Sequence, residues 1–202
     1  MFSPEQLAAL IAATSFAAGL NVYATVATLG ILTRAGVVQL PASLHLVQSW
    51  PVIAIALVLF VIEFFADKIP AFDLIWNALQ TFVRVPVAAL LAYGASANLS
   101  PTAQAIAVVA GGAIALAAHG GKTAARAAVT PSPEPLSNIA LSMGEDVFAV
   151  GLTWFATAHP FLAAATVAVL LLLTIFAVRF IWRAMRRLFR GAERQMHATH
   201  IG

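Results

Sequence analysis

The chain has 202 residues, of which 61% are hydrophobic and only 9% are charged, with a net charge of +3. An average soluble domain carries roughly a quarter charged residues. So few charges exclude a water-soluble fold, because the long apolar segments have no polar face to present to water. No cysteine is present, which excludes disulfides, thiolate metal sites and cysteine nucleophiles. We therefore predict an all-α integral membrane protein, with about six transmembrane helices in a single transmembrane domain over residues 1–202.

The first apolar segment covers residues 7–33 and is longer than the roughly 20 residues that one span needs. Polar side chains in its middle, among them Asn21 and Tyr23, predict a helix that is either tilted or broken near Gly19. A segment that folds back at this break would change the number of spans. Asn21 and Tyr23 either line a path or hydrogen-bond between helices.

The next segments are shorter and end abruptly. A second span is predicted over residues 52–66, and Pro70 prevents a simple continuation of its helix. Over residues 71–84, polar residues recur at helical spacing opposite apolar ones, which predicts an amphipathic helix in the membrane interface. A third span is predicted over residues 85–98.

The second half of the chain follows a similar plan. A fourth span is predicted over residues 101–118, followed by a proline-rich polar loop over 130–146 that can contain one short helical piece at 137–143. A fifth span is predicted over 147–158 and a sixth over 161–178. Three spans in residues 1–100 and three in residues 101–190 would place the halves in opposite orientations, so we consider a 3+3 inverted repeat.

A basic segment, residues 179–202, follows the last span. Six of the eleven Lys and Arg residues fall between Arg179 and Arg194, which predicts a helix with one basic and one apolar side. Such a helix either binds anionic lipids, at about 1 kcal/mol per basic residue, or only anchors the topology by the positive-inside rule. Six spans with a cytoplasmic carboxyl end place four further cations on the cytoplasmic side and only Arg34 outside; these four are Lys68, Arg84, Lys122 and Arg126.

Two acids mark the end of the second span. Glu63 and Asp67 are four residues apart and share one helix face, with Lys68 adjacent. Glu63 lies about one turn inside the span, where an unpaired charge costs on the order of 3 kcal/mol at full depth. The pair either binds a proton or a cation on a transport path, or forms ion pairs with nearby cations such as Arg84 and Lys122.

Further polar residues are expected at the same face. The oxygen ligands of the acidic residues favour a proton or a hard cation as the bound partner. A divalent cation is the one cofactor that we consider. The Lys and Arg residues at the same face favour an anionic substrate or a lipid phosphate instead. Glu145 and Asp146 alternatively only complement a helix dipole, and His119 alternatively hydrogen-bonds between helices. The candidate ion-binding residues are Glu63, Asp67, Lys68, Asp73, Glu134, Asn138, Glu145 and Asp146. The candidate path-lining residues are Asn21, Tyr23, His119, Lys122 and Arg126. The candidate lipid-binding residues are Arg179, Arg183, Arg186, Arg187 and Arg190.

Several motifs together resemble a known family. The segments AAGLNVY at residues 17–23, EFFADKIPAFD at 63–73, PSPEPLSN at 131–138 and SMGED at 142–146 are similar to the bacterial multi-pass membrane family called domain of unknown function 4126. The resemblance implies a helical protein of the bacterial inner membrane and brings no activity or substrate. Glu63, Asp67 and Lys68 also distantly resemble a signature of calcium/manganese–proton exchangers, with one residue too many and no second copy.

Two functions from different classes follow from these patterns. The first is a small transporter or channel, coupled to a proton or a cation, with a carboxylate cluster at its cytoplasmic mouth. The second is a non-transporting protein that binds anionic lipids or assists membrane assembly, and a homo-oligomer is compatible with either. No soluble-enzyme motif is present, so an enzyme is not predicted. The basic tail does not have the dispersed positive charge of a nucleic-acid partner.

Overall fold

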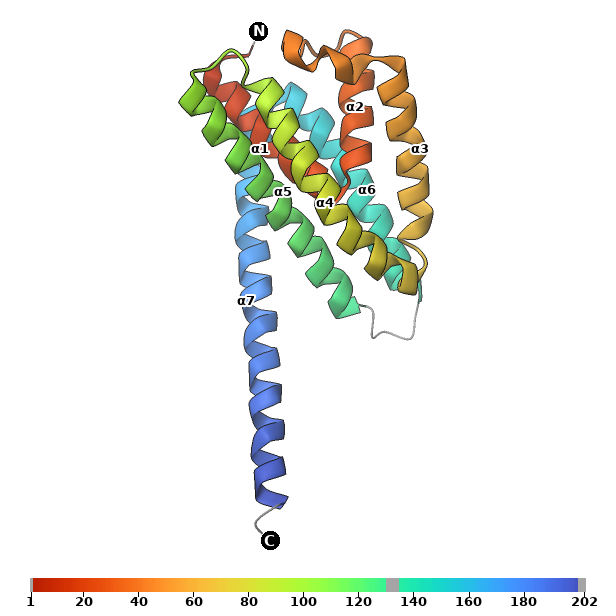
Figure 1. Ribbon diagram of the computed structural model, residues 1–202, viewed down its shortest axis with the longest axis vertical. Coiled ribbons are helices and arrows are strands. Elements are labelled where there is room, and N and C mark those ends of the chain that lie inside the picture. Colours follow the sequence, from red (N-terminus) through yellow and green to blue (C-terminus); the bar gives the residue numbers. More distant parts are fainter. Residues whose placement is uncertain (1, 130–134, 200–202) are drawn as a thin grey trace.

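The computed structural model describes residues 2–129 and 135–199, and all regular structure in these ranges is helical. This confirms the predicted all-α class. The elements are α1 (Pro4–Leu20), α2 (Val22–Arg34), η1 (Ala42–Gln48), α3 (Trp50–Ala66), α4 (Pro70–Ala95), α5 (Pro101–Val129), α6 (Pro135–Ala158) and α7 (Pro160–Thr199). They form one bundle, from which the carboxyl-terminal part of α7 projects (Figure 1).

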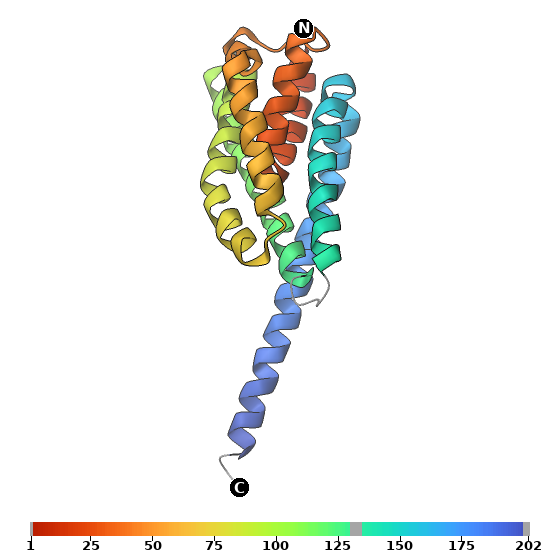
Figure 2. The same ribbon diagram turned by 90° about the vertical axis from the view of Figure 1, so that its right-hand side faces the viewer.

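The first apolar segment is broken into two helices. Asn21 ends α1 and begins α2 with an extended backbone, at φ −149° and ψ 102°. From one end of the bundle α1 runs to its middle, and α2 returns to the same end (Figures 1 and 2). The start of α1 and the end of α2 are accordingly close together. Phe2, which precedes α1, and Gln6 in its first turns line one pocket with Val37 and Val38, which follow α2. The segment is therefore a re-entrant helical hairpin, hereafter the α1–α2 hairpin.

Within the described residues, four helices contain stretches that are long and apolar enough to cross a membrane: Ile75–Ala95, Pro101–Arg126, Ile139–Ala158 and Pro160–Phe180. A fifth span results if η1 and α3, which are bent by 58°, count as one. The predicted number of six is not confirmed, because the hairpin replaces the first predicted span. As a result, the start of α1 and the end of α7 lie at opposite ends of the molecule (Figure 2).

A separate interfacial helix is not present, and that prediction is wrong. Residues 71–84 and 85–95 belong to one 26-residue helix, α4, which continues through Pro86. The polar face of α4 is buried in the protein at Asn77, Gln80 and Arg84, whereas Phe82 on the opposite face is 80% exposed. An amphipathic pattern arises equally from a helix that faces headgroups and from a span whose polar face meets other polar residues. The structure shows the second case.

The second half also differs from its predicted outline. Helix α6 begins at Pro135, so most of the expected loop over residues 130–146 is helical. The second half therefore consists of three long helices, α5 to α7, whereas the first half consists of a hairpin and two helices. The hairpin has no counterpart in α5, and the 3+3 inverted repeat stays a prediction.

Small residues place the hairpin at the centre of the bundle. Ala13, Ala17 and Ala18 of α1 are completely buried. A Cβ atom on Gly19 would lie only 2.4 Å from the carbonyl oxygen of Ala115 in α5. Small side chains allow backbones in a membrane bundle to approach this closely. The tip of the hairpin is thereby fixed between the surrounding helices, where it meets the charged residues.

Candidate functional site

The break at Asn21 leaves two helix ends with polar backbone groups inside the bundle. The carbonyl oxygens of Gly19 and Leu20, at the negative end of α1, accept hydrogen bonds from Arg84 (3.3 Å) and Lys122 (3.2 Å). At the start of α2, the Asn21 side-chain oxygen accepts from the Ala24 amide (2.9 Å). Both ends are therefore satisfied by protein groups, as a broken helix at membrane depth requires.

A network of buried charges surrounds this tip. It consists of four carboxylates and three cations, hereafter the charge cluster: Glu63, Asp67, Glu145, Asp146, Arg84, Lys122 and Arg126. All seven side chains belong to residues less than 10% exposed. They come from α3 and its C-cap, α4, α5 and α6, which share the end of the bundle away from the amino terminus.

Lys122 is the centre of the charge cluster. Its Nζ atom lies 3.0 Å from Asp67, 3.4 Å from Glu145 and 3.5 Å from Glu63. Arg126 pairs with Asp67 (2.8 Å) and Glu145 (2.7 Å). Arg84 donates to Glu63. These pairs compensate the cost of removing each charge from water, which is several kcal/mol per isolated ion.

Asp146 is the acid that the three cations do not pair with. Its Oδ1 atom accepts a hydrogen bond from the Asn21 side-chain amide (2.8 Å), and its Oδ2 atom accepts none within the described residues. Asp146 also lines a cleft of about 400 Å³ between α3 and α6, together with apolar residues such as Phe60, Phe64 and Val147. The charge cluster thus contains one carboxylate more than it has cations, and the residue without an ion pair, Asp146, lies beside a cleft.

Asp67 lies just outside the apolar span, and its ionisation is fixed by its neighbours. Burial by itself would raise the pKa of Asp67, but the positive charges of Lys122 and Arg126 lower it below the usual value. Asp67 is therefore ionised at neutral pH. Its contribution to stability is present at neutral pH and is lost only in strong acid, as the pH falls through its lowered pKa.

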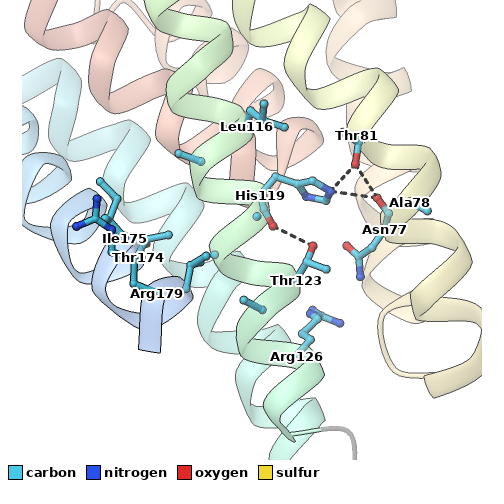
Figure 3. A pocket seen from close by; sticks show the side chains of 15 residues that line it. Asn77, Ala78, Thr81, Leu116, His119, Thr123, Arg126, Thr174, Ile175 and Arg179 are labelled. Carbon is cyan, nitrogen blue, oxygen red and sulfur yellow. Dashed lines mark hydrogen bonds between the residues drawn. The ribbon is translucent and has the colours of Figure 1, made fainter. Parts of the chain in front are cut away.

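His119 connects the charge cluster to a second cavity. Because a guanidinium group only donates, the contact of Arg84 with Nδ1 of His119 (2.8 Å) makes Nδ1 an acceptor and assigns the ring proton to Nε2. Nε2 then donates to the Asn77 carbonyl (3.1 Å) and lies 2.8 Å from the Thr81 hydroxyl (Figure 3). A proton on Nδ1 would place its N–H group against an N–H group of Arg84, so that two donors would face each other. In this arrangement His119 is a neutral hydrogen-bonding residue.

Eight of the thirteen residues predicted to bind an ion or to line a path lie together. Glu63, Asp67, Glu145, Asp146, Lys122 and Arg126 belong to the charge cluster, and Asn21 and His119 contact it. Tyr23 accepts a hydrogen bond from Gln80 (3.0 Å) instead. Lys68 donates to the Phe64 carbonyl (2.8 Å) and lies 3.0 Å above the Phe64 ring.

Some candidates lie beyond what the structure describes. Asp73 belongs to α4 and Asn138 to α6, but their side chains are not described, and Glu134 lies outside the described residues. Arg179, Arg183 and Arg186 are exposed on α7, whereas the side chains of Arg187 and Arg190 are likewise not described.

Arg84 was missed as a member of the site. From the sequence, Arg84 was expected as a partner for Glu63 and as one of four cytoplasmic cations, but it was not among the candidate site residues. Its position on one polar face of α4 with Asn77 and Gln80 was the available signal. Across residues 2–129 and 135–199, no three His, Asp or Glu side chains are grouped to hold a metal ion.

A bundle of apolar helices around a re-entrant hairpin and a buried charge cluster defines an all-α, multi-pass membrane protein. Within this class, residues 8–180 match the family model described as Domain of unknown function (DUF4126), so the chain belongs to that family. Comparisons with curated proteins and with solved structures found no match.

Proposed function

We propose that the protein is a small membrane transporter, or a channel, that binds a proton or a cation at the charge cluster. The observation that carries this proposal is the hairpin tip, where a broken helix meets ionisable residues inside the bundle. Broken helices whose ends face bound ions are typical of transporters, because irregular backbone at membrane depth is tolerated only against protein or a wet cavity. Intramembrane carboxylates likewise mark ion and proton pathways.

The excess carboxylate supports a positively charged substrate. With three cations and four acids ionised, the charge cluster carries one negative charge, which a proton or a cation would neutralise. Asp146 is the best candidate for this exchange, because it is the acid of the charge cluster without an ion pair among the described residues and it is one of the residues that line the cleft between α3 and α6. Asn21, which bonds to its other oxygen, links this exchange to the hairpin.

The proposed orientation places the charge cluster near the cytoplasmic face of a bacterial inner membrane. The carboxyl ends of α3 and α5 and the carboxyl-terminal part of α7 lie toward one end of the molecule, and the carboxyl end of α2 lies at the other (Figure 1). Lys68, Lys122, Arg126 and the arginines of α7 belong to the first group of segments, and Arg34 ends α2. The positive-inside rule favours the cytoplasm for the basic end.

Substitution of Asp146 by Asn tests the proposal. Asparagine has the same shape and still accepts a hydrogen bond from Asn21, so we expect a folded protein that no longer exchanges the ion. Purified protein is reconstituted in liposomes that contain either a pH-sensitive or a divalent-cation-sensitive dye, and a gradient is imposed. Wild-type vesicles should respond with at least one dye, and Asp146→Asn vesicles should respond at the rate of protein-free vesicles.

Glu5→Gln is the matched control. Glu5 is an exposed carboxylate at the opposite end of the bundle, so its neutralisation should leave the flux unchanged. Flux with neither dye in wild-type vesicles, or equal flux in wild type and Asp146→Asn, would overturn the proposal.

A further inference from the structure

A second cavity lies on the other side of α5 from the hairpin tip. It has a volume of about 780 Å³ and is lined by residues of α4, α5 and α7. In Figure 3, α5 lies between the other two helices, and its His119 points toward Thr81 of α4. This volume is within the roughly 300–1,000 Å³ of small-molecule sites in proteins.

The surface of the cavity is mostly apolar, and basic residues lie at one end of it. Its α5 lining extends from Leu116 to Arg126, which corresponds to about 15 Å of helix at 1.5 Å per residue. On α7 the lining extends from Thr174 through Ile175 and Val178 to Arg179. Because the apolar span of α7 ends at Phe180, Arg179 lies at the level of the lipid headgroups.

We propose that this cavity is a binding site for an anionic phospholipid, with an acyl chain against α5 and the phosphate at Arg179. The charges are complementary, since Arg183 and Arg186 continue from Arg179 at intervals of four and three residues and are also exposed. A phosphate at this level would meet a stripe of guanidinium groups. This proposal does not depend on the transport function.

Exposure of the cavity wall supports a lipid as the occupant. Only 11% of the residues in the most apolar stretch of α7, within Pro160–Phe180, are buried inside the protein, so most of this stretch is open to lipid. At Gly120, which lines the cavity, an added Cβ atom would have no neighbour within 4 Å. The floor of the cavity is therefore open to an acyl chain.

Substitution of Gly120 by Leu should fill the cavity without disturbing the backbone. Gly144→Leu is the matched control, because Gly144 also has no neighbour within 4 Å, lies in a helix and is not among the residues that line this cavity. Binding of phosphatidylglycerol and of phosphatidylcholine from mixed micelles is measured by native mass spectrometry.

We expect wild-type protein to prefer phosphatidylglycerol, and Gly120→Leu to bind it about tenfold more weakly while Gly144→Leu binds it normally. Arg179→Gln should weaken phosphatidylglycerol binding about fivefold and leave phosphatidylcholine binding unchanged. Circular dichroism checks that each variant retains its helices. Equal binding by both leucine variants, or equal binding of the two lipids by the wild type, would overturn the site. So would a change from dimer to monomer in Gly120→Leu, since the occupant would then be a second copy of the chain.

Discussion

Replacing Lys122 by Met is expected to destabilise the folded protein by about 3–5 kcal/mol, the usual cost of removing one partner from a buried ion pair. Lys122 lies within 3.5 Å of Glu63, Asp67 and Glu145 and also donates to the carbonyl oxygen of Leu20. Methionine preserves the length of the side chain but removes the positive charge that lies beside the three carboxylates. It also leaves the Leu20 carbonyl oxygen, at the end of α1, without the hydrogen bond from Lys122. The midpoint of thermal unfolding in detergent micelles measures the loss.

Lys68→Met is the matched control for this substitution. Lys68 is only partly buried and donates to the Phe64 carbonyl, so its removal should shift the unfolding midpoint much less. If both variants unfold at the same temperature, Lys122 does not hold the carboxylates together and the description of the charge cluster is wrong.

Glu63 and Arg84 are expected to stabilise the protein only as a pair. Each residue is completely buried, and Arg84 donates to Glu63 from the neighbouring helix. Either single substitution, Glu63→Gln or Arg84→Gln, leaves the other charge without its direct partner and should cost about 3–5 kcal/mol. The double variant has two neutral amides in the same place, and replacing a whole buried pair is often close to neutral.

A double-mutant cycle of unfolding free energies checks this pair. The double variant should be more stable than either single variant, with an interaction energy of at least about 1 kcal/mol. Additive losses in the double variant would show that Glu63 and Arg84 contribute independently. They would then be stabilised mainly by other groups, such as Lys122 for Glu63 and His119 for Arg84.

Local patterns were sufficient to predict several parts of the site. The four-residue spacing of Glu63 and Asp67 indicated a shared face at the end of α3, where both side chains are buried. Asn21 and Gly19 marked the break between α1 and α2. Such features depend on the spacing of residues along one helix and on polar residues within an apolar segment, and both can be read from a single sequence.

Features that depend on distant contacts were not predictable. The apolar segment over residues 7–33 is compatible with a tilted span and with a hairpin, because both structures remove the same apolar side chains from water. The hairpin is favoured by Arg84 and Lys122, which satisfy the end of α1 from positions 65 and 102 residues away in sequence. Likewise, the polar face of α4 was assigned to headgroups because its buried partner, His119 of α5, is 42 residues beyond Asn77.

The sidedness of Glu5 tests the helical hairpin most directly. The chain contains no cysteine, so Glu5→Cys, Ala35→Cys and Arg186→Cys each introduce one thiol at an exposed position. With a membrane-impermeant maleimide on sealed vesicles of known orientation, we predict that residues 5 and 35 react from the same side and residue 186 from the other. Reaction of residues 5 and 186 from one side, with residue 35 on the other, would mean that α1 and α2 form a single span and would contradict the re-entrant tip on which the proposed function depends.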